Sequence, residues 1–213
     1  DARSAAWAAA VFLSLPLVGF NSMFITTDAP LLCFWCAALW ALSHALQTDR
    51  LSYWLLVGVC SGLGLMSKYS MAILLPSAAL LLLWVPEYRY LFRRPGPYLG
   101  VLVTALIFLP NVLWNAANDF VSLKHTAEIS QLDRSSLNIA GLLEFVAAQL
   151  ICLGPWFLWW LRPGTQKPGW HLERGYKFAL MMSVCFFIVI STQALLSRAN
   201  ANWAAPGFAG IAM

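Results

Sequence analysis

Long apolar segments alternate with short hydrophilic ones throughout this chain, a pattern typical of helices that cross a membrane repeatedly. A transmembrane helix needs about 20 apolar residues to cross a hydrocarbon layer about 30 Å thick. The pattern predicts seven spans, at residues 5–24, 29–46, 53–66, 70–85, 98–114, 139–161 and 176–196. An eighth begins near Trp203 and is expected to be cut off at Met213. The expected fold class is therefore all-α, a polytopic transmembrane helix bundle.

The third and fourth spans are short, and the hydrophilic residues Ser67, Lys68 and Tyr69 separate them. One continuous helix over residues 53–85 would be about 50 Å long, too long for a single crossing. We therefore expect two helices that meet at Lys68, with the turn between them dipping toward the membrane. Irregular backbone at that depth survives only where protein or a wet cavity surrounds it.

Four hydrophilic stretches are each separated from the next by two apolar spans, so all four should emerge on one face of the membrane. They are residues 26–30, 67–69, 114–138 and 198–203. Asp28 and Lys68 lie at or near the ends of apolar runs, where an ionisable group is costly and often functional. One face is expected to carry chemistry, and the other to consist of connecting turns.

Composition supports the membrane assignment and changes how the charge is interpreted. The chain is 61% hydrophobic and only 10% charged, whereas a soluble domain would have about a quarter of its residues charged. Its 11 Trp, 13 Phe and 6 Tyr are the aromatics that favour lipid interfaces. The net charge of +4 therefore indicates no nucleic-acid partner. The distribution of the charged residues between the two faces instead indicates how the chain is oriented in the membrane.

Lys and Arg are divided unevenly between the faces. The richer face has nine, which are Arg3, Arg50, Arg89, Arg93, Arg94, Arg162, Lys167, Arg174 and Lys177. The opposite face has four, which are Lys68, Lys124, Arg134 and Arg198. The positive-inside rule places the richer face in the cytoplasm. The four hydrophilic stretches are then expected to face a periplasm or an equivalent compartment.

The cysteines and the common enzyme motifs narrow the function classes. All five cysteines lie in apolar spans, and the Cys33-x-x-Cys36 pair has no histidine or second cysteine pair with it, which favours small apolar fillers over redox or metal chemistry. No phosphate-binding loop, dinucleotide fingerprint, serine-hydrolase elbow or zinc-protease motif occurs in the sequence. An enzyme of this kind would take an activated substrate from the membrane itself.

Asp28 admits a structural and a functional interpretation. Thr27 can cap a helix that Asp28 opens, Asp28 suits its positive end, and Pro30 is tolerated in the first turn. The functional interpretation is a carboxylate at the outer rim that holds a cationic acceptor, a metal ion or a protein loop.

Lys68 likewise admits two interpretations. It can be an interfacial lysine whose ammonium reaches water beside the anchoring Tyr69. Alternatively, Gly58 and Gly62 form a small-residue face that lets helices pack closely, which would aim Lys68 toward a pocket. An ammonium in such a pocket suits a phosphate.

The two later hydrophilic stretches contain further candidates. His125 and Glu128 share a helical face at i, i+3 spacing and could contribute to a metal site, although a single histidine is more often a surface residue. Arg198 could bind phosphate through two donors. Trp203, close to Asn202, could stack on a sugar ring or anchor at the interface.

Four sequence strings share this outer face: TTDAPLL at 26–32, GLGLMSKY at 62–69, PNVLWNA at 110–116 followed by FVS at 120–122, and RANANWAAP at 198–206. In this order they resemble bacterial members of glycosyltransferase family 39, relatives of the protein mannosyltransferases and the lipid A aminoarabinose transferase. The resemblance covers nearly the whole chain. It implies the multi-span GT-C fold and transfer of a sugar from a polyprenyl-phosphate donor, on the periplasmic side of a bacterial inner membrane, to a lipid, glycan or protein acceptor.

The resemblance also implies roles for individual residues. Asp28 matches a secondary acid, and Lys68 matches the lysine that meets the donor phosphate. The expected substrate-binding residues are Lys68, Tyr69, His125, Arg198, Asn202 and Trp203. No cofactor is certain, and a divalent metal is left open.

The resemblance places the principal catalytic acid in the family's first outer loop. The first span here matches the family's third, so residues 1–213 are expected to be a partial transmembrane glycosyltransferase domain. It would lack the first spans, the first outer loop and the C-terminal part, and be inactive alone.

A transporter or flippase for a lipid-linked sugar is the alternative function, because it also needs cationic and aromatic groups near a cavity. Transporters often have internal repeats with paired broken helices. The sequence shows one candidate break, at Lys68, without a matching second half. A non-catalytic membrane scaffold is a third interpretation, disfavoured because the polar motifs gather on one face.

Overall fold

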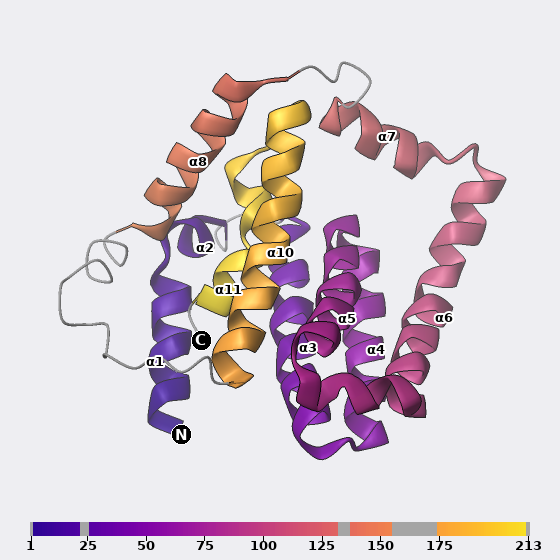
Figure 1. The fold of residues 1–213 in the computed structure, drawn as a ribbon. Coiled ribbons are helices and arrows are strands. Elements are labelled where there is room, and N and C mark those ends of the chain that lie inside the picture. Colours follow the sequence, from indigo (N-terminus) through magenta and orange to yellow (C-terminus); the bar gives the residue numbers. More distant parts are fainter. Residues whose placement is uncertain (1, 22–25, 132–136, 155–173, 212–213) are drawn as a thin grey trace. The chain divides into compact units, whose positions relative to one another are not determined.

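The protein was analysed as a computed structural model, which describes residues 2–21, 26–131, 137–154 and 174–211. All regular elements in these ranges are helical (Figure 1). The chain forms two compact units, one of residues 27–133 and one of residues 1–26 with 134–213.

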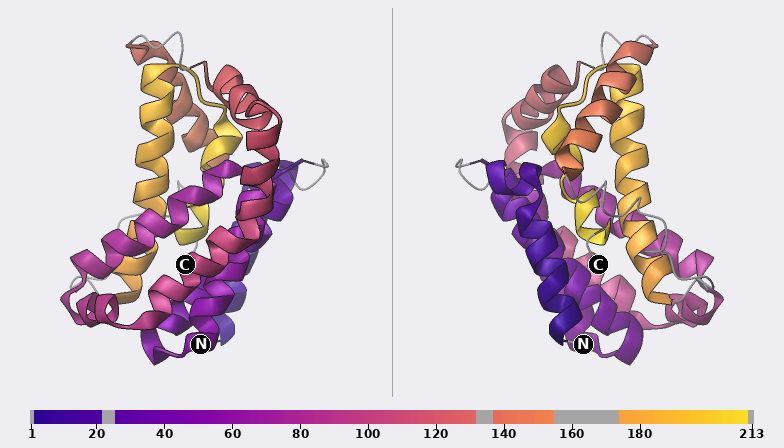
Figure 2. Two further views of the ribbon diagram at one scale, coloured as in Figure 1. Left: turned by 90° about the vertical axis from the view of Figure 1, so that its right-hand side faces the viewer. Right: turned by 90° about the vertical axis from the view of Figure 1, so that its left-hand side faces the viewer.

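The unit of residues 27–133 is built on three long helices. Its elements are α3 (Asp28–Thr48), α4 (Leu51–Ser67), η1 (Tyr69–Ile73), α5 (Leu74–Trp84), η2 (Pro86–Arg93), α6 (Pro95–Ala117) and α7 (Val121–Ser130). Helix α4 packs against both α3 and α6 (Figures 1 and 2). Helix α3 contributes aliphatic and aromatic side chains to the core, among which Trp35, Ala38 and Leu42 are almost completely buried.

Glycines let α4 and α6 approach closely. A Cβ at Gly62 would lie 2.7 Å from the Cβ of Ile107, and one at Gly58 would overlap the carbonyl oxygen of Gly100. The Thr104 hydroxyl donates a hydrogen bond to the carbonyl oxygen of Gly58 at 3.1 Å. Lipid is as apolar as leucine, so helices in a membrane associate through such close contacts. The small-residue face expected on α4 is confirmed.

The expected break at Lys68 is confirmed. Helix α4 ends at Ser67, and Lys68 has extended backbone angles, φ −159° and ψ 133°. Its N–H still bonds the carbonyl of Gly64 at 2.9 Å, and the 3₁₀ turn η1 follows directly. Met71 in this turn is buried against Gly64, where a Cβ would lie 2.6 Å from the Met71 Cγ. The chain therefore reverses at a packed turn.

The second unit contains α1 (Ala2–Ser14), α2 (Pro16–Asn21), α8 (Ile139–Leu153), α10 (Arg174–Leu196), η4 (Ala201–Ala204) and α11 (Gly207–Ile211). The expectation of one continuous span over residues 5–24 is corrected here, because the helix is interrupted at Leu15. Proline cannot donate to the preceding turn and disfavours helical angles in the residue before it, so Pro16 accounts for the interruption. Residues 22–25 lie outside the described residues.

The sixth expected span, residues 139–161, is shorter as a helix. Helix α8 ends at Leu153, and Gly154 follows with φ +59°, a left-handed angle that suits glycine. The rest of this expected span lies outside the described residues. The seventh span is confirmed by α10, whereas the region of the eighth is a 3₁₀ turn followed by the short helix α11.

Three described helices are long and apolar enough to cross a membrane, namely α3, α6 and α10. A fourth is reached if the segment Tyr69–Trp84 and η2 count as one span, although they are bent by 117° at Val85. Helices α4 and α8 are apolar but shorter. The described residues thus form an all-α membrane bundle, but they do not reach the seven complete spans expected from the sequence.

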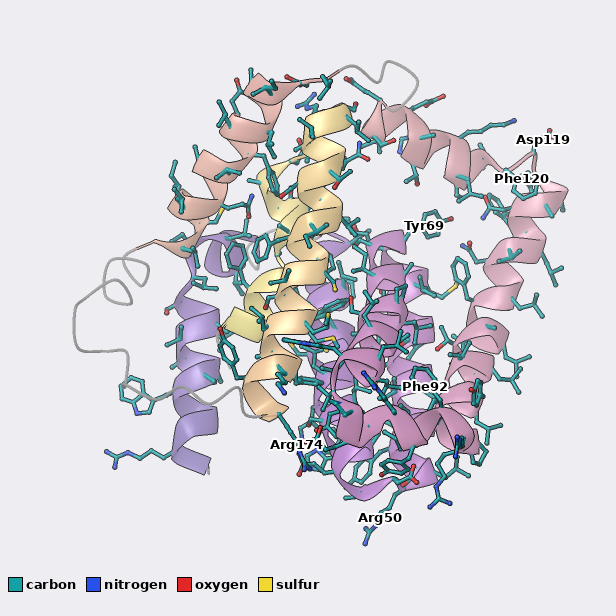
Figure 3. All side chains as sticks on the ribbon, viewed as in Figure 1. Arg50, Tyr69, Phe92, Asp119, Phe120 and Arg174 are labelled. Atoms are coloured by element: carbon teal, nitrogen blue, oxygen red, sulfur yellow. The ribbon has the colours of Figure 1, made fainter. Side chains whose placement is uncertain are left out.

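Polar side chains that are far apart in the sequence meet at the ends of each unit. In residues 27–133, the start of α3 meets the end of α4 through Asp28 and Lys68, while Asp49 pairs with Arg94 at the opposite end. Figure 3 shows the same division, with Tyr69, Asp119 and Phe120 at one end and Arg50 and Phe92 at the other.

The same holds in the second unit. The side chain of Asn138, at the start of α8, donates to the carbonyl of Ser197 at 2.9 Å. Asn138 and Ser197 therefore lie together in this unit, as Asp28 and Lys68 do in the other.

We predict that Gly62→Leu separates α4 from α6 and destabilises the full-length protein by about 2–3 kcal/mol, because a larger side chain has no room against Ile107. The measurement is thermal unfolding in detergent. The matched control is Val59→Leu on the same helix, where the side chain is 36% exposed and can expand freely. Equal stability of the two variants would contradict the close packing.

Candidate functional site

Asp28 is the first residue of α3, and its side chain is only 5% exposed. A carboxylate here is favoured by the positive end of the helix dipole, and Pro30 occupies the first turn as expected. The expectation that Thr27 caps the helix is wrong. Thr27 already has helical angles, φ −66° and ψ −11°, and its side chain makes no cap hydrogen bond, since a cap requires extended backbone.

The carboxylate of Asp28 forms an ion pair with the ammonium of Lys68, whose Nζ lies 2.5 Å from Oδ1. The two residues are 40 positions apart, and the extended backbone at Lys68 turns its side chain away from the axis of α4 toward α3. The Lys68 side chain is 24% exposed. The interpretation of Lys68 as a lysine reaching out to the lipid interface is therefore not supported, since its ammonium is directed at protein.

This arrangement leaves the ammonium able to bind an anion. An ammonium has three N–H donors, and in the described part of the chain Asp28 is the hydrogen-bond partner of Lys68. Because the lysine is partly exposed, a phosphate can reach the remaining donors without displacing the carboxylate. The pair is thus a cation held in place by a buried anion.

Tyr69, the next residue, faces α6. Its hydroxyl donates to Oδ1 of Asn111 at 3.3 Å, and its ring lies edge-on to Phe108 with the ring centroids 5.9 Å apart. The Asn111 Oδ1 also accepts from Nδ2 of Asn115, one helical turn later, at 3.1 Å. The Asn115 Oδ1 in turn accepts the backbone N–H of Ser122 at 3.1 Å. A chain of hydrogen bonds therefore connects the Lys68 turn to the start of α7.

The junction of α6 and α7 has a strained backbone. Asp119 and Phe120 have φ angles of +53° and +54°, in the left-handed region that non-glycine residues rarely adopt. The carbonyl oxygen of Asn115 accepts the N–H of Phe120 at 2.7 Å and the N–H of Asn118 at 3.1 Å. Asn115 is only 2% exposed. Its backbone and side chain together hold this junction, which Figure 3 labels at Asp119 and Phe120.

His125 lies on α7, and both His125 and Glu128 are exposed. The i, i+3 spacing on one helix exists as expected. Among the described residues, however, no three His, Cys, Asp or Glu side chains gather as a metal site would require. The structure thus places His125 and Glu128 together on α7, without a third metal-ligating side chain beside them in the described ranges.

Arg198, Asn202 and Trp203 belong to the second unit. Arg198 is exposed and follows the end of α10, while Asn202 and Trp203 are half-buried in η4. The buried Gln149 of α8 donates from Nε2 to the carbonyl of Ala201 at 3.2 Å, which ties η4 to α8. These three candidates therefore lie together on one short segment.

Sequence reasoning gave no role to Asn111 and Asn115, which the structure places at the centre of the polar contacts. A signal for them exists in the sequence. Two carboxamides at i, i+4 near the end of an apolar helix lie on one face, and polar groups in such a helix need partners. What the spacing cannot reveal is which partners they find.

Comparisons with known proteins were made on the whole chain. The family model for dolichyl-phosphate-mannose-protein mannosyltransferase matches residues 1–114. A lipid A galacturonosyltransferase of Rhizobium johnstonii is 30% identical over 209 residues, covering 95% of this chain and 42% of the relative. An undecaprenyl phosphate-α-4-amino-4-deoxy-L-arabinose arabinosyl transferase of Proteus mirabilis is 27% identical, covering 85% of this chain and 34% of the relative.

A third relative is the corresponding arabinosyl transferase 1 of Sodalis glossinidius, 36% identical over 186 residues, which cover 81% of this chain and 32% of the relative. The chain thus spans less than half the length of these curated relatives. No solved structure gave a significant match. The resemblance to bacterial glycosyltransferase family 39 is confirmed by these matches.

We predict that Lys68→Met destabilises the full-length protein more than Asp28→Asn does. Lys68→Met removes the cation from a carboxylate that is 5% exposed, at an expected cost of about 3 kcal/mol. Asp28→Asn leaves an ammonium that can still reach water. Thermal unfolding in detergent of both single variants and the double variant measures the coupling.

Arg94→Met is the matched control, because it breaks the pair of Arg94 with Asp49, in which the arginine side chain is 59% exposed. It should cost less than about 1 kcal/mol. Additive effects of Lys68→Met and Asp28→Asn would show that the two groups do not interact.

Proposed function

The chain belongs to the dolichyl-phosphate-mannose-protein mannosyltransferase family, and we propose that the full-length protein is a membrane glycosyltransferase that uses a polyprenyl-phosphate-linked sugar donor. The sugar goes to an acceptor on the periplasmic side of a bacterial inner membrane. The observation that carries the proposal is the ion pair of Asp28 and Lys68, which holds a cation where the start of α3 meets the end of α4.

Lys68 is proposed to bind the phosphate of the donor. The acceptor oxygen attacks the anomeric carbon, the bond from that carbon to the phosphate oxygen breaks, and the electron pair leaves with the lipid phosphate. An ammonium beside that phosphate stabilises the charge that develops on it. The proton of an acceptor hydroxyl passes to a carboxylate. The principal acid is proposed to lie outside residues 1–213.

Asp28 is proposed to act as a secondary acid that positions Lys68. A carboxylate 2.5 Å from the ammonium restricts the lysine side chain before the donor arrives. Binding the donor then costs less conformational entropy, because a long side chain loses up to about 2 kcal/mol of rotamer freedom when it is fixed. The pair prepares a phosphate site in a setting with few other charges.

The donor and acceptor classes are proposed from the relatives. Two are named as transferases of an aminoarabinose carried on undecaprenyl phosphate, and one is named as a transferase to lipid A. A lipid-linked donor needs no nucleotide-binding domain, since its tail partitions into the bilayer and only its head reaches the protein. The acceptor is a lipid, a glycan or a protein.

Further substrate contacts are proposed for the remaining candidates. Arg198 has the planar guanidinium that binds phosphate through two donors. Trp203 has an indole face that can stack on a sugar, with the carboxamide of Asn202 in the same turn. His125 is exposed on α7 and available to an acceptor.

We predict that Lys68→Met in the full-length protein raises the KM for the lipid-linked donor at least tenfold, because the phosphate loses its charged partner. Lys68→Arg should recover part of the affinity. The measurement is transfer of labelled sugar to acceptor in proteoliposomes. A flippase would instead move the donor between leaflets without forming a product.

Arg94→Met is the control for this assay, since it removes one cation at the opposite end of the same unit. Transfer by this variant should stay within about twofold of the parent. Unchanged donor KM in Lys68→Met would exclude the phosphate role of Lys68.

We predict that the α6–α7 junction faces the periplasm. In a cysteine-free parent, Asp119→Cys should react with a membrane-impermeant thiol reagent in intact spheroplasts, whereas Arg50→Cys should react only after permeabilisation. Asp119 and Arg50 lie at opposite ends of the unit of residues 27–133, as Figure 3 shows. The reverse labelling pattern would put Lys68 in the cytoplasm and refute the proposed orientation.

A further inference from the structure

The carboxamide of Asn115 has only one orientation that satisfies its contacts. The N–H of Ser122 is a donor, so the atom of Asn115 that faces it at 3.1 Å must be the oxygen. The amide nitrogen of Asn115 therefore faces α6, where it donates to the carbonyl oxygen and to Oδ1 of Asn111. A backbone N–H cannot change its polarity, which makes this assignment firm.

The orientation of Asn111 follows from that of Asn115. Because Nδ2 of Asn115 is a donor, the atom of Asn111 that meets it at 3.1 Å must be the oxygen. The same oxygen lies 3.3 Å from the Tyr69 hydroxyl. An oxygen without a proton only accepts, so Tyr69 must be the donor in this contact.

A phenol has one proton, and Tyr69 uses it on Asn111. The hydroxyl oxygen then has lone pairs to offer but no proton. The half-buried ring is held from the side by Phe108, at an interplanar angle of 84°. The backbone N–H of Ser122 thus sets the orientation of the Asn115 and Asn111 carboxamides. As a result, the Tyr69 hydroxyl can accept a further hydrogen bond but cannot donate one.

We propose that Tyr69 is a specificity-determining residue that accepts a hydrogen bond from a hydroxyl or ammonium group of a sugar, and that Asn111 and Asn115 are positioning residues that set this polarity. The proposal rests on the proposed function, and it assigns different parts of the substrate to the neighbouring residues Lys68 and Tyr69. Lys68 offers only donors and suits phosphate oxygens, whereas Tyr69 offers only lone pairs and repels them. The sugar group belongs either to the donor or to the acceptor.

The first test is Tyr69→Phe in the full-length protein, which removes the hydroxyl and leaves the ring. We expect the KM for one sugar substrate to rise about tenfold, which corresponds to the loss of one hydrogen bond. A rise for the lipid-linked donor assigns the contact to the donor sugar. A rise for the acceptor assigns it to the acceptor.

The second test is a pair of variants with equal charge and opposite hydrogen-bond polarity. Asn111→Asp retains an acceptor for both Asn115 and Tyr69, and we expect KM within about threefold of the parent. In Asn115→Asp, the carboxylate can still accept the N–H of Ser122, but it also presents an oxygen to Asn111. The side-chain amide of Asn111 must then rotate so that its nitrogen faces this oxygen. The same nitrogen then donates to the Tyr69 hydroxyl. Tyr69 would become a donor, and the KM rise should equal that of Tyr69→Phe.

Asn118→Asp is the control for added charge at the same junction, because the Asn118 side chain is exposed and bonds only the carbonyl of Trp114 among the described residues. A Raman difference spectrum of parent minus Tyr69→Phe supplies a readout independent of activity. The intensity ratio of the tyrosine doublet should report a donating hydroxyl in the parent and an accepting one in Asn115→Asp.

The outcomes separate this inference from the proposed function. If Tyr69→Phe leaves both KM values unchanged while Lys68→Met raises the donor KM, the role of Tyr69 is wrong and the phosphate site stands. Equal effects of Asn111→Asp and Asn115→Asp, or a doublet that reports an accepting hydroxyl in the parent, would overturn the polarity argument. If the parent protein forms no glycosylated product in proteoliposomes, the proposed function itself fails, whatever the Raman doublet reports for Tyr69.

Discussion

The contact between Asp28 and Lys68 is the constraint on which the site depends. A carboxylate with a side-chain exposure of 5% in an apolar bundle is stabilised by a cation, and Lys68 supplies one from a backbone that has left the helical path of α4. The extended backbone at Lys68 also ends α4 and starts the return through η1, so the ion pair and the chain reversal depend on the same residue.

Close packing of α4 supports this arrangement from two sides. Gly58 and Gly62 bring α6 within backbone distance, and Gly64 makes room for Met71 in the returning turn. These contacts place Tyr69 opposite the end of α6, where Asn111 lies. Small residues therefore do more than join helices here. They bring two polar segments, far apart in the sequence, to one end of the unit.

The polar contacts at that end divide into a charged part and a neutral part. Lys68 and Asp28 form the charged part, suited to a phosphate that gains charge during sugar transfer. Tyr69, Asn111 and Asn115 form the neutral part, in which the backbone N–H of Ser122 sets the orientation of both carboxamides. The proposed contacts of Lys68 with a phosphate and of Tyr69 with a sugar follow from this division. The strained Asp119 and Phe120 are held by the same asparagine that orients the neutral part.

The sequence by itself determined the helical membrane class, the break at Lys68 and the small-residue face of α4. Each depends on local composition and spacing, which are properties of the chain order. The interruption at Leu15 was also signalled locally, by Pro16, and was missed because hydropathy alone does not register it.

The tertiary structure decided which side chains meet. It paired Asp28 with Lys68 across 40 positions, left Thr27 without a cap role, and gave Asn111 and Asn115 their partners. Hydrophobic pattern records which face of a helix is buried but not what lies against it. Side-chain direction at a helix end depends on packing between helices, and a carboxamide shows its polarity only when a neighbour of known polarity is in place.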